Sequence, residues 1–295
     1  MSCNLVIIPT EQGVGSSAIR LGIKHALEQN GYSVTNFHPF NDSKITPQKL
    51  QSYFLEDRRQ DLLEDIMKEF EPFQVKADFV LVEGIYTKLS QSSELAWFAH
   101  HVDWFNAALV RAIMGNVIFV TRPTSNNLLQ LEEQITLATN DFSPEFILGA
   151  LVTKLNAPIN DDGEIRFSLI DEADEHQLNI THEQIAQLKI FADNKIKLLG
   201  TTIWNKEMTQ PRISDLMQAL NIQPLIEGGD TSRRIKQISL CSRGINNLVS
   251  DLQAGTLLIT AIDRADIIMA ASLAEARGIK LAGLLLTADY SIPQE

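Results

Sequence analysis

The sequence has few cysteines, little positive charge and no long apolar run. Cys3 and Cys241 are its only cysteines, too few for a disulfide scaffold or a structural zinc site. No apolar stretch approaches the roughly 18 residues of a membrane span, and the N-terminal MSCNLVIIPT lacks the basic region and cleavage site of a signal peptide. With 25 basic against 37 acidic residues, the net charge of −12 argues against a nucleic-acid or anionic-membrane surface. We therefore expect a cytoplasmic protein that binds neither nucleic acid nor membranes.

Short apolar runs alternate with helical patterns through the first two-thirds of the chain. Runs that are apolar throughout are typical of strands in a parallel sheet covered on both faces, which predicts an α/β fold. We expect strands at 4–9, 32–38, 79–82, 117–121, 146–153 and 197–200, and helices at 16–30, 49–70, 94–114 and 126–140.

The remaining segments indicate how the chain divides into domains. Residues 156–194 are acidic and polar, which predicts a solvated excursion. Proline and paired glycines in 222–231 favour a boundary there, so we expect domains at 1–222 and 223–295. The second domain should hold strands at 237–240, 256–260 and 281–286 and helices at 245–253 and 264–277. The last run, LAGLLL, is apolar on both alternating faces, which predicts an inner strand of an incomplete domain.

A glycine turn follows the first expected strand and precedes the first expected helix. Gly13, Gly15, Ser16 and Ser17 stand where the phosphate-binding loop of nucleotide enzymes stands, at a helix N-terminus with backbone N–H groups to offer. The loop's lysine is replaced by Ser16, which removes a charge-assisted phosphate contact. A tight turn that binds no ligand explains the same pattern.

Several longer segments carry a family resemblance. VIIPTEQGVGSSAIRLG, ADFVLVEG, ALVTKLNAP, EGGDTSRRIKQISLCSRGI, AGTLLITAIDRADIIMAASLA and AGLLLTADY resemble, in order, the N-terminal half of the long bacterial phosphate acetyltransferases. The resemblance implies a first domain with the P-loop fold of dethiobiotin synthetase and a second, smaller domain named after its DRTGG signature. The third domain of that family, which transfers acetyl groups between coenzyme A and phosphate, has no counterpart here.

The resemblance also implies a degenerate nucleotide site in the first domain. His38 stands where a phosphate-contacting lysine is expected, and Thr153 replaces a base-reading asparagine, with Asn156 three residues on. Glu83 stands at a magnesium position, although an acidic strand end near water is an equal interpretation. We expect no metal ion and no firm cofactor, and at most a weak nucleotide or metabolite effector.

The second domain offers a possible effector pocket. The family's Asp-Arg motif stands as Asp263-Arg264, and Arg233, Arg234 and Arg243 lie near the start of the domain, where they form either an anion pocket or ordinary surface charges. No nucleophile elbow and no recognisable Cys–His pairing is present, so we expect no catalytic residues.

These observations favour a regulatory and assembly region of phosphate acetyltransferase that is not catalytic by itself. Its expected partners are further copies of itself and the C-terminal acetyltransferase domain of the parent enzyme. The alternatives are an ATP-dependent ligase of the dethiobiotin synthetase type and a pure oligomerisation scaffold.

Overall fold

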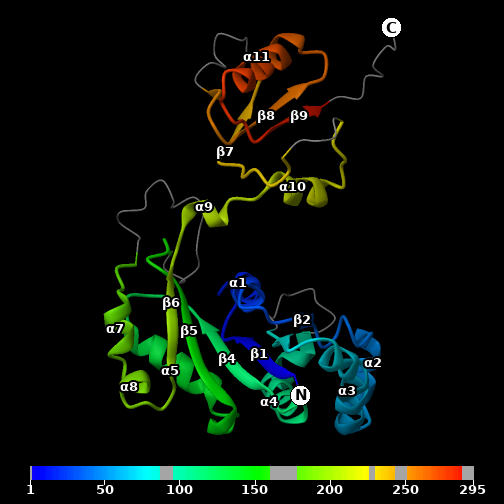
Figure 1. Ribbon diagram of the computed structural model, residues 1–295, viewed down its shortest axis with the longest axis vertical. Helices are drawn as coiled ribbons and strands as arrows, with labels where there is room; N and C mark the ends of the chain where they lie inside the picture. The colour runs from blue at the N-terminus through cyan, green and yellow to red at the C-terminus, as the bar shows by residue number, and fades with distance from the viewer. Residues whose placement is uncertain (1, 87–95, 160–177, 226–229, 243–250, 288–295) are drawn as a thin grey trace. The chain divides into compact units, whose positions relative to one another are not determined.

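The chain forms two compact units, Met1–Trp204 and Asn205–Glu295. A computed structural model describes residues 2–86, 96–159, 178–225, 230–242 and 251–287 (Figure 1). The division falls before the expected boundary at 222/223. Residues 205–222 associate with the second unit because Ile213 and Leu216 pack against a cluster of Ile235, Leu257 and Ala282.

The first unit is built on a parallel sheet of six strands in the order β2-β3-β1-β4-β5-β6. The strands are β1 (Cys3–Pro9), β2 (Val34–Phe37), β3 (Phe79–Glu83), β4 (Asn116–Thr121), β5 (Ile147–Leu155) and β6 (Leu198–Ile203). All six expected strands are therefore present. Because β1 lies between β3 and β4, the segments that follow these three strands meet at one edge of the sheet.

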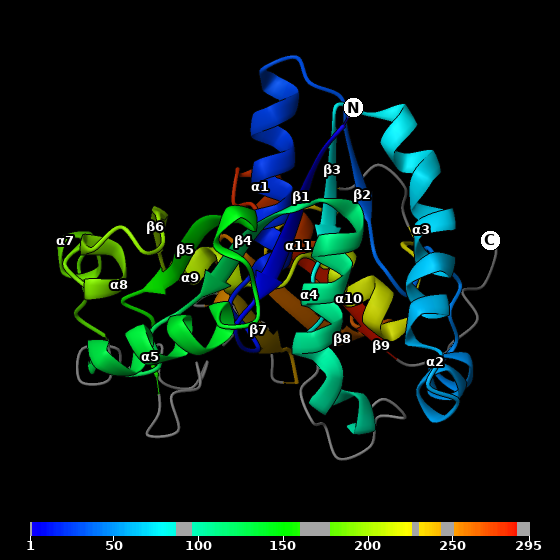
Figure 2. The ribbon, with the colours of Figure 1, turned by 90° about the horizontal axis from the view of Figure 1, so that it is seen from below.

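Helices cover both faces of this sheet. Ile7 of β1 faces α1 (Ser16–Gln29) in a small cluster with Val14, whereas Val6 and Ile8 face the main core. The main core is covered by α3 (Arg59–Lys76), α4 (Val102–Ile113) and α5 (Leu128–Thr139). Figure 2 shows α3 beside β2 at one edge of the sheet, and α7 (His182–Ala186) and α8 (Lys189–Ala192) near β6 at the other. The alternation of Val6, Ile7 and Ile8 between two cores confirms a parallel sheet covered on both faces.

The expected helix at 49–70 is two helices, α2 (Pro47–Leu55) and α3. Asp57 takes a left-handed conformation with φ of 53°, and the N–H of Arg58 donates to the carbonyl of Tyr53. This local conformation interrupts the helix, although the charge pattern continues across it. The expected helix at 94–114 is a 3-10 turn, η1 (Ala96–His101), followed by α4; a second such turn, η2 (Pro144–Phe146), precedes β5.

Only part of the expected solvated excursion lies within the described residues. Residues 178–196 belong to the folded structure, because Leu178, Ile180, Ile185 and Phe191 are buried in the main core while the polar residues between them stay exposed. The expectation is wrong for this part, since its acidic residues conceal an apolar face that α7 and α8 turn inward.

The second unit is a parallel sheet of three strands in the order β7-β8-β9 with helices on both faces. Its strands are β7 (Gln237–Leu240), β8 (Thr256–Ala261) and β9 (Gly283–Thr287), and its helices are α9 (Lys206–Thr209), α10 (Ile213–Leu220) and α11 (Ala265–Ala276). Leu258 faces α11, and Leu257 on the opposite face packs with α10. The expected helix at 245–253 falls mostly outside the described residues.

The last strand is not the inner strand that the sequence predicts. Among the described strands β9 pairs with β8 alone and lies at an edge, and Leu284, Leu285 and Leu286 are half-buried. The central strand is β8, because it hydrogen-bonds to both neighbours. Both faces of β9 do carry contacts, since Leu284 packs on the α11 side and Leu285 on the α10 side.

Within the described part of the chain, no helix is both long and apolar enough to cross a membrane.

Candidate functional site

The glycine turn connects β1 to α1 with two left-handed residues. Gly13 has φ of 76°, and Gly15, which caps the N-terminus of α1, has φ of 85°. Val14 between them is 1% exposed and anchors the turn in the α1 cluster. No side chain caps the first turn of α1, so its backbone N–H groups are not satisfied by a capping oxygen. The turn therefore has the conformation and position from which a helix N-terminus meets an anion.

Thr153 ties this turn to the sheet. Its buried hydroxyl lies 2.6 Å from the carbonyl oxygen of Val14 and 3.0 Å from that of Thr121, so one proton is shared between the two acceptors. These bonds connect the turn, β4 and β5 at one point. The family resemblance implies a residue that recognises the nucleotide base at this position. In this chain Thr153 stands there, and its hydroxyl group bonds to the backbone instead.

Two cations that sequence reasoning missed lie beside the turn. Arg122 directly follows β4, and its side chain is 8% exposed, with Nη2 3.5 Å from Oε2 of Glu11. Lys154 lies near the end of β5, and its Cε is 3.6 Å from the position that a Cβ on Gly15 would occupy. The sequence could have indicated both residues, because each directly follows an expected strand, at 117–121 and at 146–153. The carboxyl ends of neighbouring parallel strands meet at one edge of the sheet.

Burial sets the electrostatics of this cluster. The pKa of Glu11 is raised by loss of solvation, which the positive charge of Arg122 only partly opposes. The pKa of Lys154 is lowered by burial and then by Arg122, against the attraction of Glu11. Two cations and one carboxylate thus share a poorly solvated space beside the turn. The carboxylate of Glu11 supplies the negative charge there.

Glu83 already has a cationic partner. Its Oε2 lies 2.8 Å from Nη1 of Arg20, which stands one helical turn after Ser16 on α1, and the two side chains are 26% and 21% exposed. A magnesium ion at Glu83 would have to replace this ion pair. Among the described residues, no three His, Cys, Asp or Glu side chains gather closely enough to hold a metal ion.

His38 stabilises the turn that follows β2. Its ring Nδ1 accepts a hydrogen bond of 3.2 Å from the backbone N–H of Asn41. The backbone N–H of His38 donates to the Asp42 carboxylate at 2.7 Å. The Nδ1 lone pair is used within the chain, so that atom is not a phosphate donor in this arrangement.

A pocket of about 350 Å³ adjoins the glycine turn through Thr10. Its walls combine apolar side chains such as Ile8, Ile85 and Phe142 with the polar side chains of Asp103 and Gln134. Asn106 holds one wall by exchanging two hydrogen bonds of 2.9 Å with the backbone of Ile85. A pocket with both polar and apolar lining has the character of a small-molecule site.

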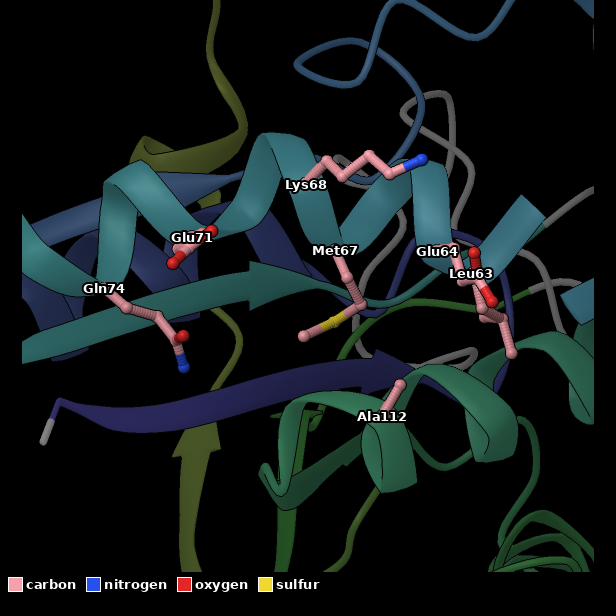
Figure 3. Close-up of a pocket in the computed structure, with 7 residues that line it drawn as sticks. All are labelled: Leu63, Glu64, Met67, Lys68, Glu71, Gln74 and Ala112. Atoms are coloured by element: carbon pink, nitrogen blue, oxygen red, sulfur yellow. The ribbon is translucent and has the colours of Figure 1, made fainter. Parts of the chain in front are cut away.

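A larger groove of about 570 Å³ lies elsewhere, between α3 and α4 (Figure 3). The Met67 side chain extends from α3 toward Ala112 of α4, and charged side chains of α3 such as Glu64 and Lys68 form the rim. None of its lining residues belongs to the glycine turn, and we read it as an imperfectly filled helix–helix contact.

The effector-binding candidates of the second unit lie at the two ends of β8. Arg233 and Arg234 line a pocket with Gly255, which precedes β8, whereas Asp263 and Arg264 follow it. Arg264 is held by Asp266 through two contacts of 2.9 Å, and Asp263 is exposed. Arg243 lies outside the described residues. Of the three arginines expected to form a pocket, Arg233 and Arg234 do line one together.

Comparisons with known proteins cover the whole chain. Residues 215–295 match the model of the DRTGG domain. The chain is 29% identical to the phosphate acetyltransferase of Haemophilus influenzae and 27% identical to that of Escherichia coli, each over 99% of this chain and 44% of the relative. The Pseudomonas aeruginosa enzyme is 28% identical over 96% of this chain and 42% of its own length.

Solved structures give only weak likenesses. Cobyrinic acid a,c-diamide synthase from Mycobacterium smegmatis, with bound ADP and magnesium, has 14% identity and a TM-score of 0.33, covering 61% of this chain and 84% of that one. The septum site-determining protein MinD from Pyrococcus horikoshii, with Mg-ADP, has 13% identity and a TM-score of 0.29, covering 60% and 79%. At such TM-scores these likenesses say nothing about the function of this chain.

The sequence comparisons confirm the resemblance. The chain spans less than half the length of the relatives it matches. Over 99% of its length it is similar to the N-terminal part of the phosphate acetyltransferases, and residues 215–295 are similar to the DRTGG domain.

Proposed function

We propose that this chain is a regulatory and assembly region of a phosphate acetyltransferase, without catalytic activity of its own. The parent reaction implied by the relatives is the interconversion of acetyl-CoA and phosphate with acetyl phosphate and CoA. One observation carries the proposal: the chain matches its relatives over 99% of its own length but only 44% of theirs. Its expected working partner is the C-terminal acetyltransferase domain of such an enzyme.

The geometry of the glycine turn supports effector binding better than ATP chemistry. Ser16 stands where a lysine would contact phosphate, and Glu83 is paired with Arg20. Arg122 and Lys154 keep positive charge beside the turn, partly neutralised by Glu11. We therefore propose weak binding of a nucleotide or other small anionic metabolite at this turn.

A direct assay tests the absence of catalysis. The purified chain is mixed with acetyl-CoA and phosphate, and released CoA is measured with a thiol reagent, with the full-length H. influenzae enzyme as the positive control. We expect no release above the level of a mock purification. Turnover that follows the chain through successive purification steps would refute the proposal.

The second candidate is an ATP-dependent ligase of the dethiobiotin synthetase type. It is favoured by the two left-handed glycines at the start of α1 and opposed by Ser16. Calorimetric titration with MgATP separates the possibilities: a dissociation constant at or below the low micromolar range favours the ligase, weaker binding the regulatory role, and no heat with any metabolite a pure scaffold.

A further inference from the structure

A basic pocket lies at the amino edge of the second unit's sheet. It has a volume of about 410 Å³, and its lining includes Arg233, Arg234, Lys236 and Lys280, with Asp230 as the one acidic member. The whole chain has a net charge of −12, so this concentration of cations opposes the general charge of the molecule. All of these residues fall within the DRTGG match, and the pocket lies at the opposite end of β8 from Asp263-Arg264.

Gly255 brings the two lysines together. Its N–H donates to the carbonyl of Lys280 and its carbonyl accepts from the N–H of Lys236, both at 2.8 Å. Gly255 has φ of +86°, and a Cβ there would lie 2.5 Å from Cγ of Lys236. Only glycine therefore allows the Lys236 side chain to cross this point. Gly255 therefore holds the backbones of Lys236 and Lys280 on its two sides.

Backbone carbonyls orient the two arginines. Nη1 of Arg234 donates to the carbonyls of Gln210 at 2.8 Å and Met208 at 3.2 Å. Nη1 of Arg233 donates to the carbonyl of Leu281 at 2.7 Å and to the Glu275 carboxylate at 2.5 Å. Carbonyl oxygens have no formal charge, so they position the Arg234 guanidinium without cancelling its charge, whereas Arg233 also forms an ion pair with Glu275. Both arginines are half-buried, which limits their movement.

Three acidic groups near the pocket cancel part of its positive charge. Asp230 accepts from the N–H and hydroxyl of Ser232, and these bonds lower its pKa. Lys236 reaches Glu207 at 3.2 Å, but the two side chains are 49% and 66% exposed, so water screens that pair. Four cations against Asp230, Glu207 and Glu275 leave the site positive.

We propose that this pocket binds a small phosphorylated metabolite, with its phosphate held by Arg233 and Arg234 and flanked by Lys236 and Lys280. A guanidinium group can donate two parallel hydrogen bonds to two oxygens of one phosphate. A lysine ammonium adds a compact positive charge. The volume lies within the range of small-molecule sites. Long polyanions such as nucleic acids are disfavoured because the rest of the chain repels them. The inference concerns binding alone and stands whether or not the proposed regulatory role holds.

Titration with inorganic pyrophosphate at low ionic strength, followed by calorimetry and by the amide resonance of Gly255, tests the proposal on the full chain. The test variant is the double substitution Lys236→Gln with Lys280→Gln. Arg277→Gln removes a nearby exposed charge outside the pocket, and Lys154→Gln removes a cation from the glycine turn. Circular dichroism checks that each variant is folded.

We expect the double variant to bind pyrophosphate at least about 10-fold more weakly and Arg277→Gln to bind as the wild type does. The Gly255 resonance should shift on titration of the wild type, and added salt should weaken binding. Absence of binding at millimolar pyrophosphate would overturn the proposal. So would an unmoved Gly255 resonance, or a loss seen with Lys154→Gln instead of the double variant, which would assign the anion to the glycine turn.

Discussion

Nη1 of Arg20 lies 2.8 Å from Oε2 of Glu83, which joins α1 to the carboxyl end of β3. The side chain that follows Gly15 in the turn is Ser16, and the first cation of this helix, Arg20, stands one turn further on. There it neutralises a carboxylate of the chain itself. The pair gives a structural reason to expect a weak nucleotide site, because it occupies the carboxylate that the family resemblance assigns to magnesium.

Removal of this ion pair should destabilise the first unit modestly. A double-mutant cycle with Arg20→Gln and Glu83→Gln should give a coupling free energy of about 1 kcal/mol, since both side chains are largely but not fully buried. The Lys24–Glu28 pair, at 3.7 Å and more exposed, is the matched control on the same helix and should give about 0.3 kcal/mol. Urea denaturation measures both, and equal couplings would contradict the argument.

Restoring a cation at the turn should strengthen nucleotide binding. Ser16→Lys should improve MgATP affinity by about one to two decades, because a charge-assisted hydrogen bond contributes roughly 1.5–3 kcal/mol. Gln29→Lys adds the same charge at the far end of α1 and is expected to leave affinity unchanged. If calorimetry shows equal gains for both, general charge attraction explains the effect, not the turn.

The stability of the chain should depend on pH through Glu11. Its pKa is raised in the folded state by burial, so its contribution is fully present below the unfolded pKa near 4.5 and is lost as pH rises through the folded pKa. Relative to Glu11→Gln, the wild type should therefore lose stability as pH increases above about 4.5. Denaturation midpoints of both proteins across this range measure the difference, and parallel curves would refute it.

Thr153 should be needed for the shape of the turn. Thr153→Val leaves the carbonyls of Val14 and Thr121 without their hydroxyl donor, which should cost about 1–3 kcal/mol of unfolding free energy. Amide exchange of residues 13–17 should also accelerate. Thr136→Val removes an exposed hydroxyl that bonds within α5, and it should change stability by less than about 0.5 kcal/mol. Unchanged exchange in Thr153→Val would show that the turn holds its conformation without this bond.

Self-association should involve the uncovered side of β7. Ile238 and Leu240 project from this edge strand with 61% and 70% of their surface exposed, and apolar strand edges favour pairing with another copy. We expect the wild-type chain to associate in light scattering and Leu240→Lys to shift it toward the monomer. Leu55→Lys, at an 80% exposed leucine of α2, should not do so. A wild type that stays monomeric at all concentrations would exclude this interface.

Local pattern was enough to predict the order of elements. The six strands of the first sheet and the glycine turn follow from short apolar runs and from Gly13 and Gly15, because these features depend on neighbours in sequence. The break at Asp57 was not predictable in this way, since a charged residue in a left-handed conformation looks like any exposed helix position. The apolar face of residues 178–196 was hidden in the same way by its acidic residues.

The sequence by itself determined the parallel α/β character of this protein, its resemblance to the N-terminal part of phosphate acetyltransferases, and the absence of a lysine at position 16. Only the tertiary structure decided what surrounds the glycine turn. Arg122 and Lys154 are 32 residues apart, yet they lie at the ends of adjacent strands. Strand order likewise placed β9 beside β8 alone among the described strands. The physical reason is that strand order is set by which apolar faces pack together, and that depends on residues distant in the sequence.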